Sequence, residues 1–397
     1  MPETNSPRAS RALRVAMIGH GFMGAAHSVG WRQAQHVFDL PTPVEMAVVV
    51  GRNEDAVAAH ARKWGWQEHA TDWRDVVARD DIDIVDIVTP GDSHAEIAVA
   101  ALEAGKHVLV EKPLANTVAE AEAMTDAADR AASHGVRSMV GFTYRRVPAA
   151  TLLRDLIAEG KVGRVQQVRA AYRQDWLVDP EAPLTWRLQK ERAGSGTLGD
   201  IGAHAIDLVQ FATGQDVRRV SGTIETLVPE RPLLGEGIGL SGTASAERGA
   251  VTVDDVALFT GRLADGALAS FEATRFATGR KNALQIEVSG DRGALVWDLE
   301  DLNSLQFYDR TLPGPLQGFT RILVTEPEHP YVGAWWPAGH MLGYEHAFTH
   351  QAVDFVAAIA SGTDPAPSFA DGLQVQRVLD AVERSSERES IWVSVAD

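Results

Sequence analysis

Two short segments carry side chains whose types and spacing fit acid–base chemistry. Glu111, Lys112 and Pro113 follow the apolar run HVLV, and Asp200 and His204 lie four residues apart in GDIGAH. A lysine at a strand end, fixed by a following proline, can bind a hydroxyl group. A histidine on the same helix face as a carboxylate can accept a proton while the carboxylate holds the ring. Lys112, Asp200 and His204 are therefore candidate catalytic residues.

Each of these residues also has a purely structural interpretation. Lys112 fits a surface lysine at a strand end, Asp200 fits a helix cap and His204 fits a core histidine. A zinc site at Asp200 and His204 lacks an evident third ligand, so we predict no metal. The chain has no cysteine, which excludes disulfides, thiolate zinc sites and a cysteine nucleophile.

A glycine pattern near the start of the chain fits a dinucleotide-binding turn. GHGFMG places Gly19, Gly21 and Gly24 at the spacing G-x-G-x-x-G, directly after the apolar run RVAM. Gly19 permits a tight turn, Gly21 lets the backbone approach a pyrophosphate, and Gly24 allows close helix–strand packing. The following helix offers free N–H groups to phosphates. Phe22 and Met23 lie in the same turn and complete this predicted site, although a structural turn also fits the glycines alone.

The first 140 residues alternate between strand and helix patterns. The predicted strands are 14–18, 45–50, 82–88, 107–110 and 137–140, and the predicted helices are 23–35, 55–64, 93–104 and 118–134. This alternation predicts βαβ units and a parallel sheet. The glycine turn and the Glu-Lys-Pro segment then both fall at carboxyl ends of strands, where open α/β sheets bind ligands.

The end of the second strand bears on the choice between NAD and NADP. NAD sites usually place an acidic residue there to bind the ribose 2′-hydroxyl. Here the chain reads Gly51-Arg52-Asn53, with no Asp or Glu in that place. Arg52 can pair with a 2′-phosphate, which favours NADP. The alternative is an exposed Arg52, with Asn53 binding the 2′-hydroxyl of NAD.

Further polar and aromatic residues are expected at the same edge of the sheet. Thr89 and Pro90 end the third strand, and His94 lies in the first turn of the next helix. Cofactor contact and a capped turn fit them equally. The aromatic and guanidinium groups of Trp186-Arg187 and of the segment 144–146 suit a nicotinamide amide or a sugar. The aromatic-rich segment 329–346 suits sugar C–H bonds, and core packing explains all of these residues as well.

After about residue 144 the pattern changes from alternating units to consecutive hairpins. The predicted strands are 165–176, 217–226, 256–262, 267–275, 284–289 and 294–298, and the predicted helices are 148–159, 201–213, 345–359 and 370–384. The segment 228–250 is rich in glycine and polar residues and is predicted to be a surface loop. We therefore expect a dinucleotide-binding domain at 1–143 and an α+β substrate and oligomerisation domain at 144–397.

The length and composition of the chain limit which classes of protein it can belong to. Two domains fit 397 residues, and the formal charge of −17 argues against nucleic acid as a partner. No apolar stretch approaches the roughly 18 residues that a membrane span needs. The first ten residues lack the apolar core of a secretion signal, so we expect a cytoplasmic protein without membrane contact.

The motifs GHGFMG, TPGDSH, EKP and GDIGAH, in this order, resemble the glucose-fructose oxidoreductase/inositol dehydrogenase (Gfo/Idh/MocA) family. The resemblance covers essentially the whole chain. It implies an N-terminal Rossmann domain with a doubly wound parallel sheet, followed by an α+β domain with a large open, mostly antiparallel sheet. It also implies NAD or NADP as cofactor, oxidation of a secondary hydroxyl of a sugar, anhydrosugar or cyclitol, and a homodimer or homotetramer.

The resemblance also implies roles for individual residues. Those implied are catalytic Lys112, Asp200 and His204, with a cis bond to Pro113; dinucleotide contacts from Thr89, Pro90, His94, Glu111, Lys112, Trp186 and Arg187; and substrate contacts from Tyr144, Gln174, Asp175 and His204. Two other functions remain open. One is NAD-dependent glycoside hydrolysis through transient oxidation. The other is a dinucleotide-binding regulator without turnover, against which the intact catalytic trio argues.

Overall fold

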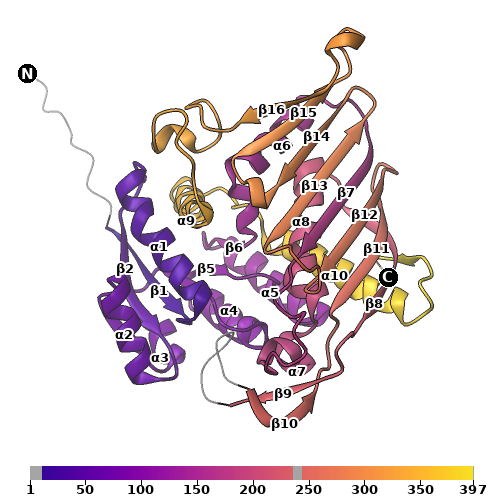
Figure 1. Ribbon diagram of the computed structural model, residues 1–397. Helices are drawn as coiled ribbons and strands as arrows, with labels where there is room; N and C mark the ends of the chain where they lie inside the picture. The colour runs from indigo at the N-terminus through magenta and orange to yellow at the C-terminus, as the bar shows by residue number, and fades with distance from the viewer. Residues whose placement is uncertain (1–10, 236–243, 397) are drawn as a thin grey trace, which may run out of the picture.

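The computed structural model describes residues 11–235 and 244–396, which fold around two large β-sheets (Figure 1). The first sheet has six parallel strands in the order β3-β2-β1-β4-β5-β6. The strands are β1 Leu13–Ile18, β2 Val44–Val50, β3 Glu68–Ala70, β4 Ile84–Ile87, β5 His107–Val110 and β6 Ser138–Val140. The strand order reverses at β1 and β4, the place where doubly wound sheets bind dinucleotides.

Both faces of this sheet are buried, as a parallel sheet requires. Successive residues of β1 show it, because Ala16 and Ile18 join one apolar core while Val15 and Met17 join another on the opposite face. The covering helices are α1 Phe22–Val37, α2 Glu54–Trp64, α3 Trp73–Val77, α4 His94–Glu103 and α5 Val118–Ala132. The predicted Rossmann fold is confirmed; β3 and α3, which are short, were not predicted.

The second sheet has nine strands in the order β16-β15-β14-β13-β7-β12-β11-β8-β17. They are β7 Val165–Arg173, β8 Val217–Glu225, β11 Val256–Leu263, β12 Leu268–Thr274, β13 Ala283–Gly290, β14 Gly293–Asp298, β15 Ser304–Asp309, β16 Phe319–Leu323 and β17 Val393–Ser394. Only β7 and β12 pair in parallel among these described strands. The predicted large, mostly antiparallel sheet is confirmed. The domain boundary after residue 143 stays a prediction.

The prediction for the segment 228–250 is wrong. The segment 228–250 was predicted to be a surface loop, but its described ends form a two-stranded antiparallel sheet. These strands are β9 Glu230–Leu234 and β10 Ala244–Ala250, and residues 236–243 lie outside the described residues. Glycine-rich polar sequence gives little strand signal, so the backbone pairing rather than side-chain patterning defines this hairpin.

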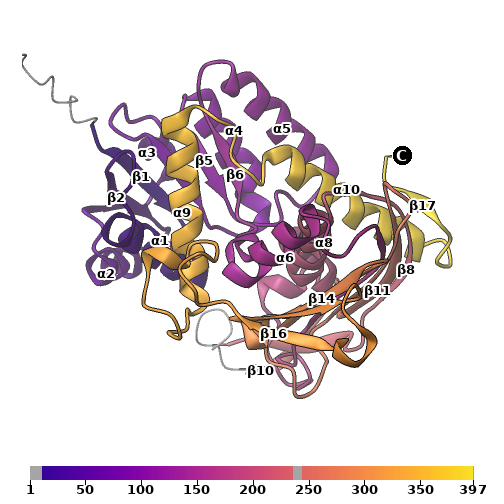
Figure 2. The same ribbon diagram turned by 90° about the horizontal axis from the view of Figure 1, so that it is seen from above.

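Helices cover one face of the second sheet, between it and the first domain (Figure 2). They are α6 Pro148–Ala158, α8 Ala203–Thr213 and α10 Phe369–Ser386; the short α7 Lys190–Ala193 lies near the edge of the first domain. A π-helical turn, Leu198–Gly202, leads into α8. The sequence predicted one regular helix over 201–213. Such turns occur frequently at functional sites.

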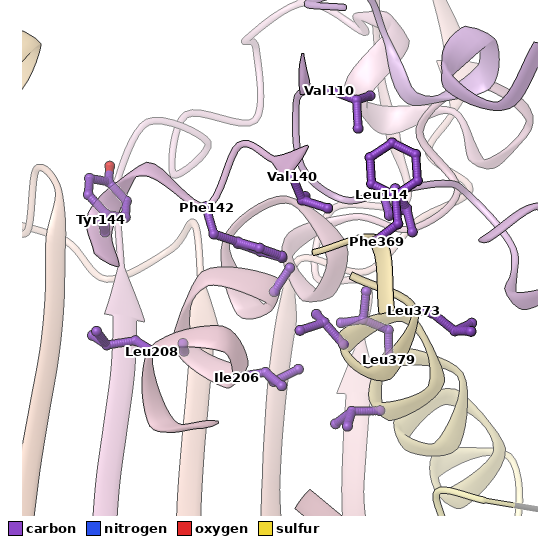
Figure 3. Packing of buried hydrophobic residues seen from close by; sticks show 14 of the residues in the cluster. Val110, Leu114, Val140, Phe142, Tyr144, Ile206, Leu208, Phe369, Leu373 and Leu379 are labelled. Carbon is purple, nitrogen blue, oxygen red and sulfur yellow. The ribbon is translucent and has the colours of Figure 1, made fainter. Parts of the chain in front are cut away.

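A single apolar core joins the two domains (Figure 3). Val110 and Val140 at the ends of β5 and β6 belong to the same cluster as Ile206 of α8 and Phe369 of α10. Because this core starts at the strand ends, it fixes the Glu-Lys-Pro segment relative to the π-helical turn. No helix in the described residues combines the length and apolar character that crossing a bilayer requires.

The long helix α9, Tyr344–Ser361, packs directly on α1 of the first domain (Figure 2). Gly30 makes this approach possible. A Cβ atom at Gly30 would lie 2.8 Å from the backbone oxygen of Phe348. The contact is therefore closer than any side chain at this position allows.

We predict that Gly30→Ala destabilises the protein by about 1–3 kcal/mol through overpacking. At an exposed helical position the same substitution would stabilise by roughly 0.5–1 kcal/mol. Urea unfolding of the two proteins measures the difference. An unfolding midpoint equal to or above that of the parent chain would contradict the close packing of α1 on α9.

Candidate active site

Lys112, just beyond β5, meets Asp200 of the π-helical turn across the domain junction. Lys112 Nζ donates to the backbone oxygen of Asp200 at 2.6 Å and lies 3.1 Å from its carboxylate Oδ1. The other oxygen, Oδ2, accepts from Arg275 Nη2 at 2.6 Å. The side chain of Lys112 is 13% exposed and that of Asp200 is 32% exposed, so solvent reaches the pair from one side.

The cations around Asp200 hold it ionised. Burial raises the pKa of Asp200, but the positive charges of Lys112, Arg275 and Arg187 outweigh it and bring the pKa well below its usual range. Asp200 is therefore a carboxylate at neutral pH. A fixed anion between cations can neither donate a proton nor accept one easily, so its chemistry is to hold Lys112 in place.

His204 lies one turn further on, within an aromatic surround. Its ring centroid is 4.7 Å from that of Tyr144, 5.8 Å from Tyr172 and 6.0 Å from Phe142. Burial lowers the pKa of His204 well below 6.5, and the charge of Lys112 lowers it further against the opposing effect of Asp200. The imidazole is therefore neutral at pH 7 and free to accept a proton.

No hydrogen bond among the described residues supports the prediction that Asp200 holds the His204 ring. In the described part of the chain the carboxylate bonds Lys112 and Arg275, and Nδ1 of His204 is buried without a partner. The four-residue spacing misled because Asp200 lies in a π-helical turn instead of a regular α-helix, and because Lys112 and Arg275 bind its carboxylate. Asp200 acts on His204 only through its charge.

A chain of hydrogen bonds runs from Tyr144 into the second sheet. Tyr144 and Tyr172 share a bond between hydroxyl oxygens 2.8 Å apart, and Tyr172 donates to Asn282 Oδ1 at 2.7 Å. Gln174 Nε2 donates to the same oxygen at 2.8 Å, and Gln174 Oε1 accepts from Trp176 Nε1 at 2.9 Å. The structure thus brings two predicted substrate residues, Tyr144 and Gln174, into one network beside His204.

Asp175, the third residue predicted to contact substrate, has protein partners instead. Its Oδ2 accepts from Lys281 Nζ at 2.7 Å and from the backbone N–H of Gly279 at 3.0 Å. The ion pair with Lys281 lowers the pKa of Asp175. Its predicted substrate role stays a prediction.

Four residues at this junction were not named individually from the sequence, although one of them, Tyr344, lies in the aromatic-rich segment 329–346. Tyr172 and Asn282 extend the network, and Arg275 pairs with Asp200. The ring of Tyr344, at the start of α9, lies 6.3 Å from those of Tyr144 and of Phe22 in the glycine turn. Arg275 left a sequence signal, as a charged residue ending an apolar strand, and Tyr344 left one as part of the aromatic-rich segment. The places of Tyr172 and Asn282 depend on which strands pair.

The glycine turn has the geometry that a dinucleotide requires. Gly19 has φ +113°, and a Cβ there would lie 2.8 Å from the backbone oxygen of Val88. A Cβ at Gly24 would meet Gly19, whereas a Cβ at Gly21 would meet nothing within 4 Å. Gly21 begins α1 without a side-chain cap, which leaves the first N–H groups for phosphate. Phe22 is 68% exposed beside this turn, and Met23 packs partly into the core.

The end of β2 lies against the glycine turn. A Cβ at Gly51 would lie 2.1 Å from Nδ1 of His20, so the imidazole occupies the space that a side chain would fill. Arg52 is exposed, while Asn53 caps α2 by accepting from the N–H of Ala56 at 2.9 Å. Asn53 therefore has a structural role, and Arg52 remains available to a ligand.

Other predicted dinucleotide residues lie at the neighbouring strand ends. His94 is buried, with Nε2 2.9 Å from the oxygen of Thr89 and Nδ1 3.1 Å from that of Pro113. It therefore ties the ends of β4 and β5 together rather than facing solvent. Thr89 accepts from Ser93 at 2.7 Å, and Pro90 is the N-cap of the next turn. The Lys112–Pro113 bond is cis, as expected.

Trp186 and Arg187 form a stacked pair near Asp200. The guanidinium carbon of Arg187 lies 4.5 Å from the Trp186 ring centroid. Burial lowers the pKa of Arg187, and the charge of Asp200 opposes this. Glu111 is buried and directs its carboxylate to His27 rather than outward. The cofactor contacts of these residues stay predictions.

The protein combines a parallel sheet, a glycine turn and a candidate acid–base site at the junction of its two domains. These features together define the class of dinucleotide-dependent oxidoreductases. Residues 13–142 match the model of an oxidoreductase family with an NAD-binding Rossmann fold, and residues 151–296 match the GFO/IDH/MocA C-terminal domain. The chain therefore belongs to the GFO/IDH/MocA oxidoreductase family, and it is an NAD(P)-dependent dehydrogenase.

Several known proteins are similar over their whole length. Levoglucosan dehydrogenase of Pseudarthrobacter phenanthrenivorans is 42% identical, over 96% of this chain and 98% of its own. An oxidoreductase domain protein from Kribbella flavida is 60% identical, with a TM-score of 0.93 over 97% of this chain and 100% of its own. A levoglucosan dehydrogenase structure with NADH and levoglucosan is 40% identical, with a TM-score of 0.91 over 98% and 100%.

We predict that Gly51→Ala weakens dinucleotide binding about tenfold, because the new methyl group displaces His20 from its place beside the glycine turn. In a protein that already carries His20→Ala, the same substitution should weaken dinucleotide binding only slightly. Calorimetric titration of the four proteins with NAD and NADP measures this coupling. Equal losses in both backgrounds would show that His20 does not transmit the effect.

Proposed function

We propose that the enzyme oxidises a secondary hydroxyl group of a sugar, anhydrosugar or cyclitol with NAD or NADP. The observation that carries this proposal is the convergence of Lys112, Asp200 and His204 at the junction between the glycine turn's domain and the second sheet. A cation and a neutral imidazole side by side are suited to removing a hydroxyl proton.

In this proposal each of the three side chains has a separate role. The ammonium group of Lys112 binds the hydroxyl oxygen of the substrate, and Asp200 keeps that ammonium in place from 3.1 Å away. His204 accepts the hydroxyl proton, and the charge of Asp200 stabilises the imidazolium that forms. A bound nicotinamide dinucleotide supplies the hydride acceptor.

The dinucleotide would lie along the glycine turn. The positive φ of Gly19, the open space at Gly21 and the uncapped start of α1 fit a pyrophosphate. The exposed Arg52 and the absence of an acidic residue at the end of β2 support acceptance of NADP. The NADH found in the similar levoglucosan dehydrogenase structures supports NAD, so both cofactors belong in the test.

The substrate class is inferred from the wall of the site and from the relatives. Tyr144 and Tyr172 offer aromatic faces and hydroxyl groups beside His204, and Trp176 bonds Gln174 of the same network; sugar sites commonly combine such groups. Levoglucosan, the substrate named for a relative 42% identical, is the first sugar to test. Assembly as a homodimer or homotetramer remains a prediction.

The purified protein should reduce NAD or NADP with one class of sugar, seen as a rise in absorbance at 340 nm. The panel should include levoglucosan, glucose, xylose, inositols and aryl glycosides. Cleavage of aryl glycosides without net reduction would favour the glycosidase alternative instead. Dinucleotide binding without any turnover would favour a regulator.

With the active sugar, Lys112→Ala should lower kcat by about 10²–10⁴ while the protein still folds, because Arg275 still pairs with Asp200. Lys161→Ala is the matched control, because Lys161 pairs only with the surface residue Glu159 in the described structure. Near-normal turnover of the Lys112 variant would refute the assignment.

The acidic limb of kcat/KM for sugar oxidation should lie below pH 6.5. Burial and the charge of Lys112 lower the pKa of His204, so the base form persists as the pH falls. Activity is then lost only when the pH drops through that lowered pKa. A steady-state profile from pH 4.5 to 9 measures it, and an acidic limb at or above pH 7 would exclude His204 as described.

A further inference from the structure

A buried charged cluster lies directly behind Lys112 and connects three elements of the first domain. His27 of α1 places Nδ1 3.0 and 2.9 Å from the two carboxylate oxygens of Asp86 in β4. Its Nε2 lies 3.0 Å from Oε1 of Glu111, the residue before Lys112. All three side chains are almost fully excluded from solvent, so they have no direct contact with a substrate.

The cluster contains one cation and two acidic groups. Burial lowers the pKa of His27, but Asp86 and Glu111 outweigh it and raise the pKa to about 10. His27 is then an imidazolium that donates from both ring nitrogens. Asp86 also accepts a hydrogen bond from Trp31 Nε1 at 2.7 Å. The uncharged ring of Phe348, in α9, packs against the ring of His27.

Glu111, held by His27, also contacts the backbone of Lys112. Its second oxygen, Oε2, accepts from the backbone N–H of Lys112 at 3.3 Å. A Cβ atom at Gly141 would lie 2.8 Å from Oε1 of Glu111, so the carboxylate packs closely against the backbone of Gly141, which follows β6. The orientation of the backbone that carries Lys112 therefore depends on where His27 holds Glu111.

We propose that His27 is a positioning residue for Lys112, acting through Glu111. Its charge matters more than its volume, because it neutralises one of two buried carboxylates that otherwise repel each other beside the lysine. The inference rests on the proposed role of Lys112 in hydroxyl binding. It extends the site into α1, the helix whose first residues follow the dinucleotide turn.

The test compares His27→Gln with Trp31→Phe. Both substitutions remove a hydrogen bond to Asp86, but only the first removes the cation and the contact with Glu111. His27→Gln should lower kcat by about tenfold or more, with little change in the KM for the dinucleotide, because a small misplacement of a reacting group is costly. Trp31→Phe should lower the unfolding midpoint and leave kcat close to that of the parent.

The pH profile separates positioning from simple destabilisation. Without the cation, Asp86 and Glu111 repel each other, and one of them keeps its proton to a higher pH. The kcat of His27→Gln should therefore gain an ionisation above which activity falls. That ionisation should be missing in the parent, in Trp31→Phe and in the double variant His27→Gln/Glu111→Gln, which has only one of the two carboxylates.

A second readout does not need sugar turnover. Competitive acetylation followed by mass spectrometry gives the reactivity of Lys112, which should change severalfold in His27→Gln and stay unchanged in Trp31→Phe. If the parent oxidises no sugar, the proposed function fails, and this labelling still decides the role of His27. Should His27→Gln not fold, Glu111→Gln alone should alter Lys112 reactivity. Parent-like kcat and labelling in a folded His27 variant would overturn the proposal.

Discussion

The contact between Lys112 and Asp200 joins groups that belong to different domains, and much of the molecule is arranged to allow it. The ammonium extends from the end of β5, and the carboxylate lies in the turn before α8. A partly buried charge is costly without a partner, so the two domains are most stable when docked in this register. The apolar core shared by β5, β6, α8 and α10 provides the energy for docking, and the ion pair makes it specific (Figure 3).

Charges of opposite sign alternate through the centre of the protein. The His27 imidazolium lies between the carboxylates of Asp86 and Glu111. On the other side of Glu111 in the chain is Lys112, and the carboxylate of Asp200 lies between Lys112 and Arg275. Lys112 lowers the pKa of both Asp200 and His204, which gives a fixed carboxylate and a neutral imidazole at the same junction. Pairs of groups whose pKa values are pushed in useful directions are typical of acid–base sites.

Much of the fold and the position of the candidate site were predictable because their signals are local. Alternating strands and helices, the G-x-G-x-x-G turn, Lys112 after a strand, and Asp200 with His204 all appear in short stretches whose periodicity or spacing has a direct physical meaning. The same locality explains the errors. Spacing alone suggested that Asp200 holds His204, whereas Arg275, 75 residues away in the chain, competes for that carboxylate. The glycine-rich segment 228–250 has no side-chain pattern that would reveal β9 and β10.

The sequence by itself determined the two-domain α/β and α+β organisation, the dinucleotide turn and the three candidate catalytic residues, because each depends on neighbouring residues along the chain. Only the tertiary structure decided which partners they have. The parallel pairing of β7 with β12 brings Tyr172 and Arg275 to the site, and the packing of β4, β5 and α1 brings Asp86 and Glu111 to His27. These contacts join residues far apart in sequence, and they form because buried charges and hydroxyl groups must find partners once apolar packing has excluded water.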